Sequence, residues 1–98
     1  MTAHPSGAEA WEWDEGNEDE LWQHRITPRD VYDVRASGPV WVPNKKHRAG
    51  DWKMIGWNRS GALLTIVIRY YSERSVIRPI TGWSTTAGER AKYSRHLK

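Results

Sequence analysis

The amino-acid sequence predicts an α+β domain: two N-terminal helices, a four-stranded antiparallel sheet, and a C-terminal helix. Two helix-start signals lie within residues 14–34, where apolar residues recur at helical spacing. From Gly38 the pattern changes to the period of two that is typical of strands, and a further capping sequence follows near the C-terminus. This order favours a fold in which the helices pack on one face of a sheet and leave the other face free for a site.

The 98 residues are enough for one small domain with a single core. Residues 1–10 are small and polar, without an apolar stretch typical of a signal peptide, and we expect them to be a disordered tail before a single domain over residues 11–98. No apolar run approaches the roughly 20 residues that a membrane helix needs. The chain has no cysteine, which fits a reducing compartment. We therefore expect a cytoplasmic protein with no membrane partner.

The helices before the sheet are predicted from their start signals. Residues 11–13 alternate Trp-Glu-Trp and are compatible with an extra short strand. Asp14 is the expected N-cap of a helix that begins at residue 15 and ends at residue 23 or 25, with an acidic first turn that suits the helix dipole. Thr27, followed by a proline, is the expected N-cap of a second helix, whose buried side is supplied by Val31 and Val34.

The expected strands cover residues 40–42, 51–57, 63–71 and 75–81. The third is rich in β-branched residues and apolar on both faces, which indicates a central strand. Pro79 indicates an edge or a bulge in the fourth. Thr86 and Glu89 have capping-box spacing and predict a last helix that extends to about residue 97.

The charge is divided unevenly along the chain. Residues 1–34 carry nine Asp and Glu against two Arg, a balance of −7, whereas residues 35–98 carry thirteen Lys and Arg against three acids, a balance of +10. Such a basic segment is a possible surface for phosphates, unless the two halves neutralise each other in the folded protein.

Three cations of the basic segment lie inside predicted strands, and they indicate where on the fold a phosphate-binding surface could lie. Lys53, Arg69 and Arg78 lie in three successive predicted strands, so that in a suitable register they form a basic stripe across the open face of the sheet. The alternative interpretation is an ordinary solvated face. Lys45 and Lys46 lie in a basic loop, and the last helix carries Arg90 and further cations that also suit a helix C-terminus.

The four histidines are scattered, and no pair has the helical spacing of a zinc site. No cysteine is available as a further ligand, so we expect neither a metal site nor another cofactor. His24 falls at a helix end, where a structural role is the simpler interpretation.

Short motifs follow one another in a fixed order between residues 11 and 93. They are Trp11-Glu12-Trp13-Asp14, Asn17, Leu21, His24 with Ile26, Lys53 to Gly56, the strand over residues 63–71, Arg78 to Trp83, and Glu89-Arg90 with Tyr93. In this order they resemble the BrnT-type toxins of type II toxin–antitoxin systems. Each motif alone is weak, and it is their shared order that carries the resemblance.

The resemblance implies a RelE-like fold and a small endoribonuclease that halts translation without a metal ion. In the implied reaction the RNA 2′-hydroxyl attacks the adjacent phosphate, while the protein supplies acid–base groups and cations. The implied partners are RNA and a cognate BrnA-like antitoxin, in a homodimer or a toxin–antitoxin heteromer. The candidate catalytic residues are Lys53, Arg78, His24 and Glu89, and the candidate nucleic-acid-binding residues are Arg69, Trp83, Arg90, Lys45 and Lys46.

Two positions depart from the family pattern. Lys53 stands where the family has Arg, which keeps the charge and loses the bidentate fork, and Trp83 stands where the family has a basic residue. A tryptophan cannot stabilise a phosphorane, although it could stack on a base. Two alternatives therefore remain open beside the ribonuclease: a non-catalytic nucleic-acid-binding module on the same fold, and a protein-interaction domain that uses the acidic N-terminal segment and exposed Trp residues.

Overall fold

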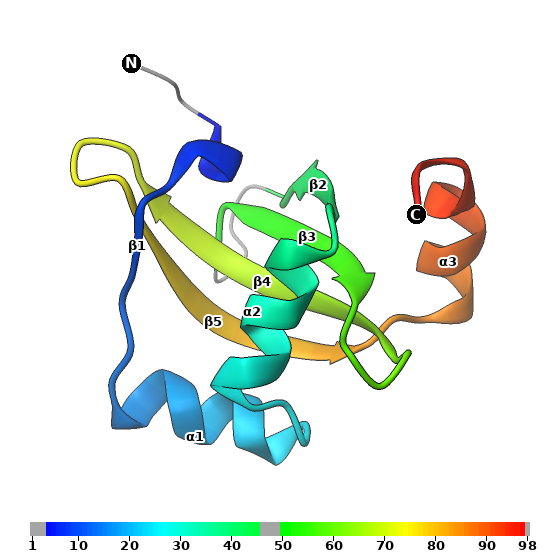
Figure 1. Ribbon diagram of the computed structural model, residues 1–98, viewed down its shortest axis with the longest axis horizontal. Helices are drawn as coiled ribbons and strands as arrows, with labels where there is room; N and C mark the ends of the chain where they lie inside the picture. Colours follow the sequence, from blue (N-terminus) through cyan, green and yellow to red (C-terminus); the bar gives the residue numbers. More distant parts are fainter. Residues whose placement is uncertain (1–3, 46–49, 98) are drawn as a thin grey trace.

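The computed structural model describes residues 4–45 and 50–97 and confirms the α+β class. Within these residues, five strands form one sheet in the order β1-β5-β4-β3-β2 (Figure 1). The strands are β1 (Ala10–Trp11), β2 (Val40–Pro43), β3 (Trp52–Trp57), β4 (Leu63–Tyr71) and β5 (Val76–Ser84). The short N-terminal strand is present and pairs in parallel with β5, whereas the other pairs are antiparallel. The sheet is therefore mixed and has one strand more than the four-stranded antiparallel sheet expected.

Local capping explains where the three α-helices begin. They are α1 (Glu15–Gln23), α2 (Pro28–Ala36) and α3 (Ala87–Tyr93), and short 3₁₀ helices cover Pro5–Gly7 and Ser94–His96. Each α-helix opens with a capping box, in which the N-cap side chain and the side chain three residues later each accept the other's backbone N–H. The N-caps are Asp14, Thr27 and Thr86, as the sequence predicts. None of the described helices is long and apolar enough to cross a membrane.

The core lies between α1, α2 and one face of the sheet. Its buried residues alternate along the strands with residues of the opposite face, as the pleat requires. They include Leu21, Ile26, Val31, Val34, Met54, Leu64, Ile66, Ile68 and Ile77. The alternate positions of β3, β4 and β5 define the open face, and they include Lys53, Ile55, Thr65, Val67, Arg69, Arg78, Thr81 and Trp83.

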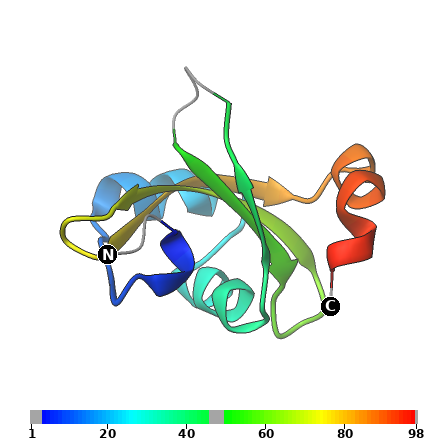
Figure 2. The same cartoon turned by 90° about the horizontal axis from the view of Figure 1, so that it is seen from above.

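Helix α3 does not join the helices that cover the core. It stands apart from α1 and α2 at one end of the sheet, as both views show (Figures 1 and 2). It contains no buried residue and is attached through Glu89, which binds side chains of the open face, and through Arg90, whose guanidinium carbon lies 5.3 Å from the ring centroid of Trp57. The expectation that all helices pack on one face is therefore wrong for α3, because a helix this short and polar has no apolar side to bury.

A bulge at Pro79 sets which residues of β5 reach the open face. Ile68 pairs with Pro79 and Val67 pairs with Thr81, so Ile80 is an additional residue in β5. The bulge predicted from Pro79 is confirmed. β1 pairs only with Val76 and Ile77, so within the described residues β5 also lies at the edge of the sheet at Pro79. The extra residue shifts the alternation by one position, so that Thr81 and Trp83 share the face of Arg78.

The N-terminal segment is more ordered than the sequence predicts. Within residues 4–10, which we expected to be part of a disordered tail, Pro5 and Ala8 are buried. The Arg35 guanidinium donates to the backbone oxygens of Ser6 and Ala8, at 2.9 and 3.1 Å. Burial of two apolar residues and satisfaction of two carbonyls offset the entropy of ordering this stretch.

Candidate functional site

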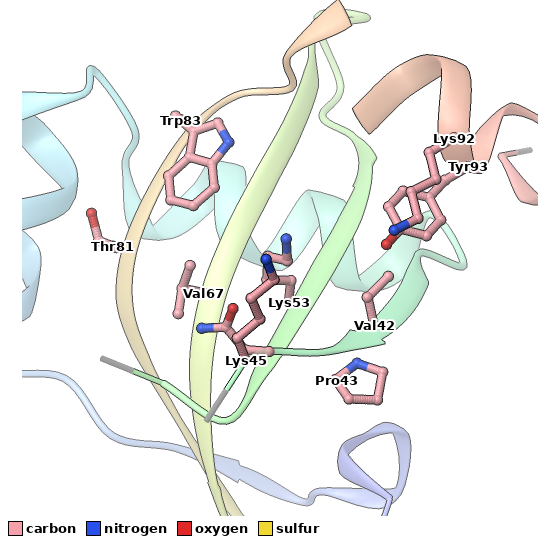
Figure 3. Close-up of a pocket in the computed structure, with 10 residues that line it drawn as sticks. Val42, Pro43, Lys45, Lys53, Val67, Thr81, Trp83, Lys92 and Tyr93 are labelled. Atoms are coloured by element: carbon pink, nitrogen blue, oxygen red, sulfur yellow. The ribbon is translucent and has the colours of Figure 1, made fainter. Parts of the chain in front are cut away.

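The open face carries a cavity of about 650 Å³ between the sheet and α3 (Figure 3). β2, β3, β4 and β5 supply its floor and walls, and α3 closes one side. The lining residues are Val42, Pro43, Asn44, Lys45, Lys53, Val67, Thr81, Trp83, Lys92 and Tyr93. Three of these are lysines and two are aromatic, so the cavity combines positive charge with flat apolar surfaces.

Glu89 organises the wall of this cavity beside α3. Its Oε1 accepts hydrogen bonds from Trp83 Nε1 at 2.9 Å, from the Thr86 backbone N–H at 3.0 Å and from Thr65 Oγ1 at 3.2 Å. Its Oε2 lies 3.7 Å from Lys53 Nζ. Glu89, which belongs to the capping box that starts α3, thus also fixes the side chain of Trp83 in β5 and faces the ammonium group of Lys53 in β3.

These contacts determine the ionisation of Glu89. Burial acts to raise the pKa of the Glu89 carboxyl, but the hydrogen bonds from Thr86, Trp83 and Thr65, with the nearby Lys53 charge, outweigh it and hold the pKa below its ordinary value. A carboxylate of lowered pKa with one oxygen occupied by three donors is a poor general base. We therefore assign Glu89 a positioning role for Lys53 and Trp83.

Lys53 is the central cation of the cavity. It projects from β3 opposite Val67, and its side chain is 21% exposed, so the stem is covered while the ammonium group reaches the cavity. Of its three N–H donors, one can face Glu89, which leaves others for a ligand. Lys45 and Lys92 lie at exposed positions of the lining and add positive charge around it.

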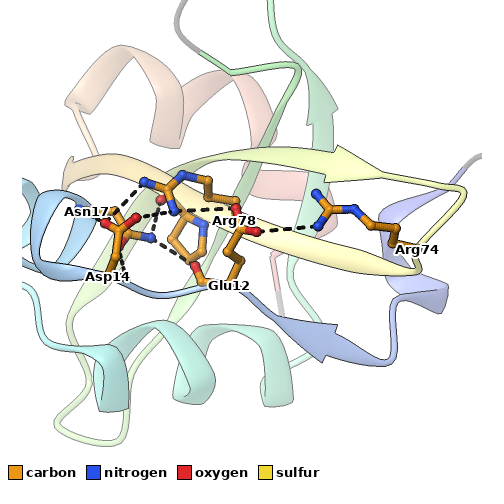
Figure 4. Close-up of polar contacts among 6 residues, drawn as sticks. Glu12, Asp14, Asn17, Arg74 and Arg78 are labelled. Atoms are coloured by element: carbon orange, nitrogen blue, oxygen red, sulfur yellow. Dashed lines mark hydrogen bonds and ion pairs between the residues drawn. The ribbon is translucent and has the colours of Figure 1, made fainter.

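Arg78 lies on the same face but does not line the cavity, and its side chain reaches Glu12 and Asp14 (Figure 4). Its two terminal nitrogens bind Asp14, with NH1–Oδ2 at 3.0 Å and NH2–Oδ1 at 3.2 Å, and NH1 also lies 3.4 Å from Glu12 Oε1. The hydrogen bond with Asp14 raises the pKa of Arg78 and lowers that of Asp14. The best-supported phosphate ligand of the sequence is thus engaged by two carboxylates and is not part of the cavity lining.

The partners of Arg78 belong to a segment that Asn17 holds in place. This segment, residues 9–14, is called the strap here. Buried Asn17 donates through Nδ2 to the backbone oxygens of Glu12 and Pro79, at 3.0 and 2.9 Å, and its Oδ1 accepts from the Asp14 backbone N–H at 2.8 Å. The Trp-Glu-Trp-Asp motif with Asn17 therefore joins the strap to β5 and neutralises part of the basic half.

The remaining predicted site residues are spread over the molecule. His24 is the C-cap of α1, with Nε2 3.4 Å from Glu20 Oε2, and Glu20 in turn accepts a hydrogen bond from Thr81 at 2.8 Å. Arg69 is the exposed register partner of Arg78, and Arg90 lies against Trp57. Lys46 lies outside the described residues. Of the predicted site residues, Lys53, Trp83 and Glu89 lie next to one another, and Lys45 lies at the border of the same cavity.

Four polar residues of the lining were not among the predicted site residues: Asn44, Thr81, Lys92 and Tyr93. Thr81 could not be placed because its face depends on the bulge. The cations of the last helix were explained by the helix dipole, and Tyr93 entered only through the closing Glu-Arg-x-x-Tyr motif. Among the described residues, no group of three or more His, Cys, Asp or Glu is placed to hold a metal ion.

No protein-family model matches this chain, and no curated protein matches it in sequence. Its function has therefore to be inferred from the site.

Proposed function

We propose that this protein binds single-stranded RNA in the open-face cavity and cleaves it without a metal ion, as a toxin-like endoribonuclease of the BrnT type with a RelE-like fold. The observation that carries the proposal is the convergence of Lys45, Lys53 and Lys92 with Trp83 and Tyr93 on one cavity. The proposal includes a cytoplasmic location and a BrnA-like antitoxin as partner, in a heteromer or beside a toxin homodimer.

The composition of the cavity supports a single-stranded ligand. Cations that follow a phosphate backbone and aromatic rings that stack with bases are the two features of sequence-tolerant single-strand binding. RNA bases are available for stacking on a side chain only where they are unpaired and unstacked, because in a duplex the faces of each base are covered by the neighbouring base pairs. A cavity lined by three lysines and two aromatic side chains suits an unpaired segment better than a duplex.

The cavity also supplies groups that the implied cleavage needs. When the 2′-hydroxyl gives up its proton to water and its oxygen attacks the adjacent phosphate, the phosphorane gains negative charge, which the ammonium group of Lys53 is placed to stabilise. The bond to the 5′-oxygen then breaks, and this oxygen needs a proton. The Tyr93 hydroxyl and the Lys92 ammonium group, both on the α3 wall, are the donors that the lining offers. A positioned acid of this kind contributes about 10²–10⁴-fold.

The test is cleavage of a defined single-stranded RNA by the purified protein in EDTA. We expect cuts by the wild type and loss of most of the activity in Lys53→Ala. Arg59→Ala is the matched control, because it removes one cation from an exposed turn whose backbone binds Asp33 of α2, away from the open face. Equal cleavage by Lys53→Ala and wild type, with folded protein, would refute the site.

A non-catalytic RNA-binding module is the second candidate, and two observations favour it. Arg78 is tied to Asp14 and Glu12, and Trp83 occupies the position of a basic residue in the family. This candidate predicts binding that weakens with salt in proportion to the phosphates contacted, without product formation. Binding curves at several salt concentrations, run beside the cleavage assay, separate the two functions.

A further inference from the structure

The indole of Trp83 is held as a fixed flat surface on the open face. Its only hydrogen-bond donor, Nε1–H, is used by Glu89 at 2.9 Å. Thr86 and Thr65 bind the same carboxylate oxygen, so the ring is anchored to the start of α3 and to β4. In Figure 3 the ring is seen broadly from its face, on the side of the cavity opposite Tyr93.

Lys53 lies on the same face of the sheet as the Trp83 indole, at a position set by the strand register. Lys53, Val67 and Thr81 are register partners across β3, β4 and β5, and Thr65 and Trp83 form the neighbouring pair along the same face. One strand, β4, lies between Lys53 and Trp83, and Trp83 is two residues further along β5 than Thr81. The two backbones are therefore about 12 Å apart, a distance that the two long side chains shorten. The floor between them is Val67, which is apolar and 3% exposed. The cavity thus has a cation at one end of an apolar floor and an aromatic plane at the other.

We propose that Trp83 is the nucleobase-binding residue of this cavity, so that one nucleotide is held with its base stacked on the indole and its phosphate at Lys53. The cavity volume of 650 Å³ lies within the range of about 300–1,000 Å³ for small-ligand sites. The inference rests on the proposed function for RNA as the source of the nucleotide, and it requires no cleavage.

The geometry also predicts low base selectivity from this residue. Because Glu89 occupies the indole N–H, Trp83 offers a base its π-surface and no hydrogen bond. Stacking on an aromatic side chain is tolerant of base identity, since every base has a π-face. Binding should therefore depend strongly on the presence of a base and weakly on which base it is.

The test uses the indole N–H signals of the seven tryptophans in a proton–nitrogen correlation spectrum of the full chain. Trp83→Phe identifies the Trp83 signal by its disappearance. Adenosine 3′-monophosphate is then titrated into wild type, beside ribose 5-phosphate, which carries a phosphate without a base. We expect the Trp83 signal to move with the nucleotide, and ribose 5-phosphate to bind about 5- to 150-fold more weakly.

The variants separate stacking from folding. Trp83→Leu should make nucleotide and ribose 5-phosphate bind alike, Trp83→Phe should keep part of the difference, and Trp22→Leu, at an exposed position of α1, should change nothing. Dispersion of the amide spectrum reports whether each variant is folded. If Trp83→Leu does not fold, the wild-type titration and Trp83→Phe still decide.

Three results would overturn the inference: no binding of the nucleotide, a Trp83 signal that stays still while another indole signal moves, or equal affinity for the two probes. The proposed function fails separately. A chain that cleaves RNA through Lys53 but shows no Trp83 response keeps the function and loses the inference, whereas Trp83-dependent nucleotide binding without RNA cleavage does the reverse.

Discussion

Asn17 is expected to be the most sensitive polar residue of the fold. Asn17→Ala removes two donated hydrogen bonds and one accepted bond that together join the strap, α1 and β5. The Pro79 oxygen is buried in this contact and loses its partner at a cost of about 1–3 kcal/mol. The other two bonds are half-buried, where water can replace the side chain, and contribute about 0.5–1.5 kcal/mol each. We expect a loss of about 3–4 kcal/mol in the free energy of unfolding.

This loss is a large part of the roughly 5–15 kcal/mol that stabilises a small domain. It corresponds to a fall in Tm of about 12–30 °C. Urea unfolding followed by far-UV circular dichroism measures it, with an unchanged dependence on urea as the sign of an intact native state. Gln23→Ala, at an exposed position of the same helix, is the control and should stay within about 0.5 kcal/mol of wild type. A loss below about 1 kcal/mol for Asn17→Ala would refute the reasoning.

Three further predictions concern the site and the sheet around it. Glu89 has a lowered pKa in the folded protein, so its stabilisation is present above its unfolded pKa of about 4.3 and is lost as pH falls through the folded value. The stability difference between wild type and Glu89→Gln, measured by urea unfolding across acidic pH, should therefore be largest near neutrality and narrow in acid; a difference independent of pH would contradict this. Arg78→Lys loses the contact of two guanidinium nitrogens with Asp14 and should loosen the strap. Hydrogen–deuterium exchange of the Glu12 backbone N–H, which binds the Ile77 oxygen at 2.9 Å, should therefore become faster, while exchange in β3 and β4 stays as in wild type. Gly82→Ala places a Cβ 2.9 Å from the Thr65 backbone oxygen and should lower the free energy of unfolding by about 1–3 kcal/mol. Gly88→Ala, at a nearly open position of α3, should leave this free energy unchanged or raise it by up to about 1 kcal/mol. Thermal unfolding of both variants measures the contrast.

Much of the local structure could be predicted because its signals are local. The capping boxes at Thr27 and Thr86 depend on residues three positions apart, and they place the starts of α2 and α3. The strand over residues 63–71 is found at the predicted bounds, since its apolar composition on both faces admits a central strand. Pro79 marked a bulge for the same reason: its missing N–H is a property of the residue alone.

The candidate site was less predictable because it depends on contacts between distant segments. Nothing local indicates that Arg78 meets Asp14, 64 residues away in the chain, instead of a phosphate. The placement of Thr81 and Trp83 on the open face follows from one inserted residue in β5, and a slip of this size reverses a whole strand end. Glu89 was predicted as a helix-capping residue and as a candidate catalytic residue, and its bonds to Trp83 and Thr65 appear only when the start of α3 lies against the open face.

The parallel pairing of β1 with β5 imposes an order on the assembly of the protein during synthesis. β2, β3 and β4 pair with neighbours along the chain and can form as soon as they leave the ribosome, whereas Ala10 must wait for Val76. Until then the acidic strap and its tryptophans have no β5 to join. We expect the nascent chain to close its sheet only after β5 has been made, and the cavity, which needs both β5 and α3, to be completed only after α3 has followed.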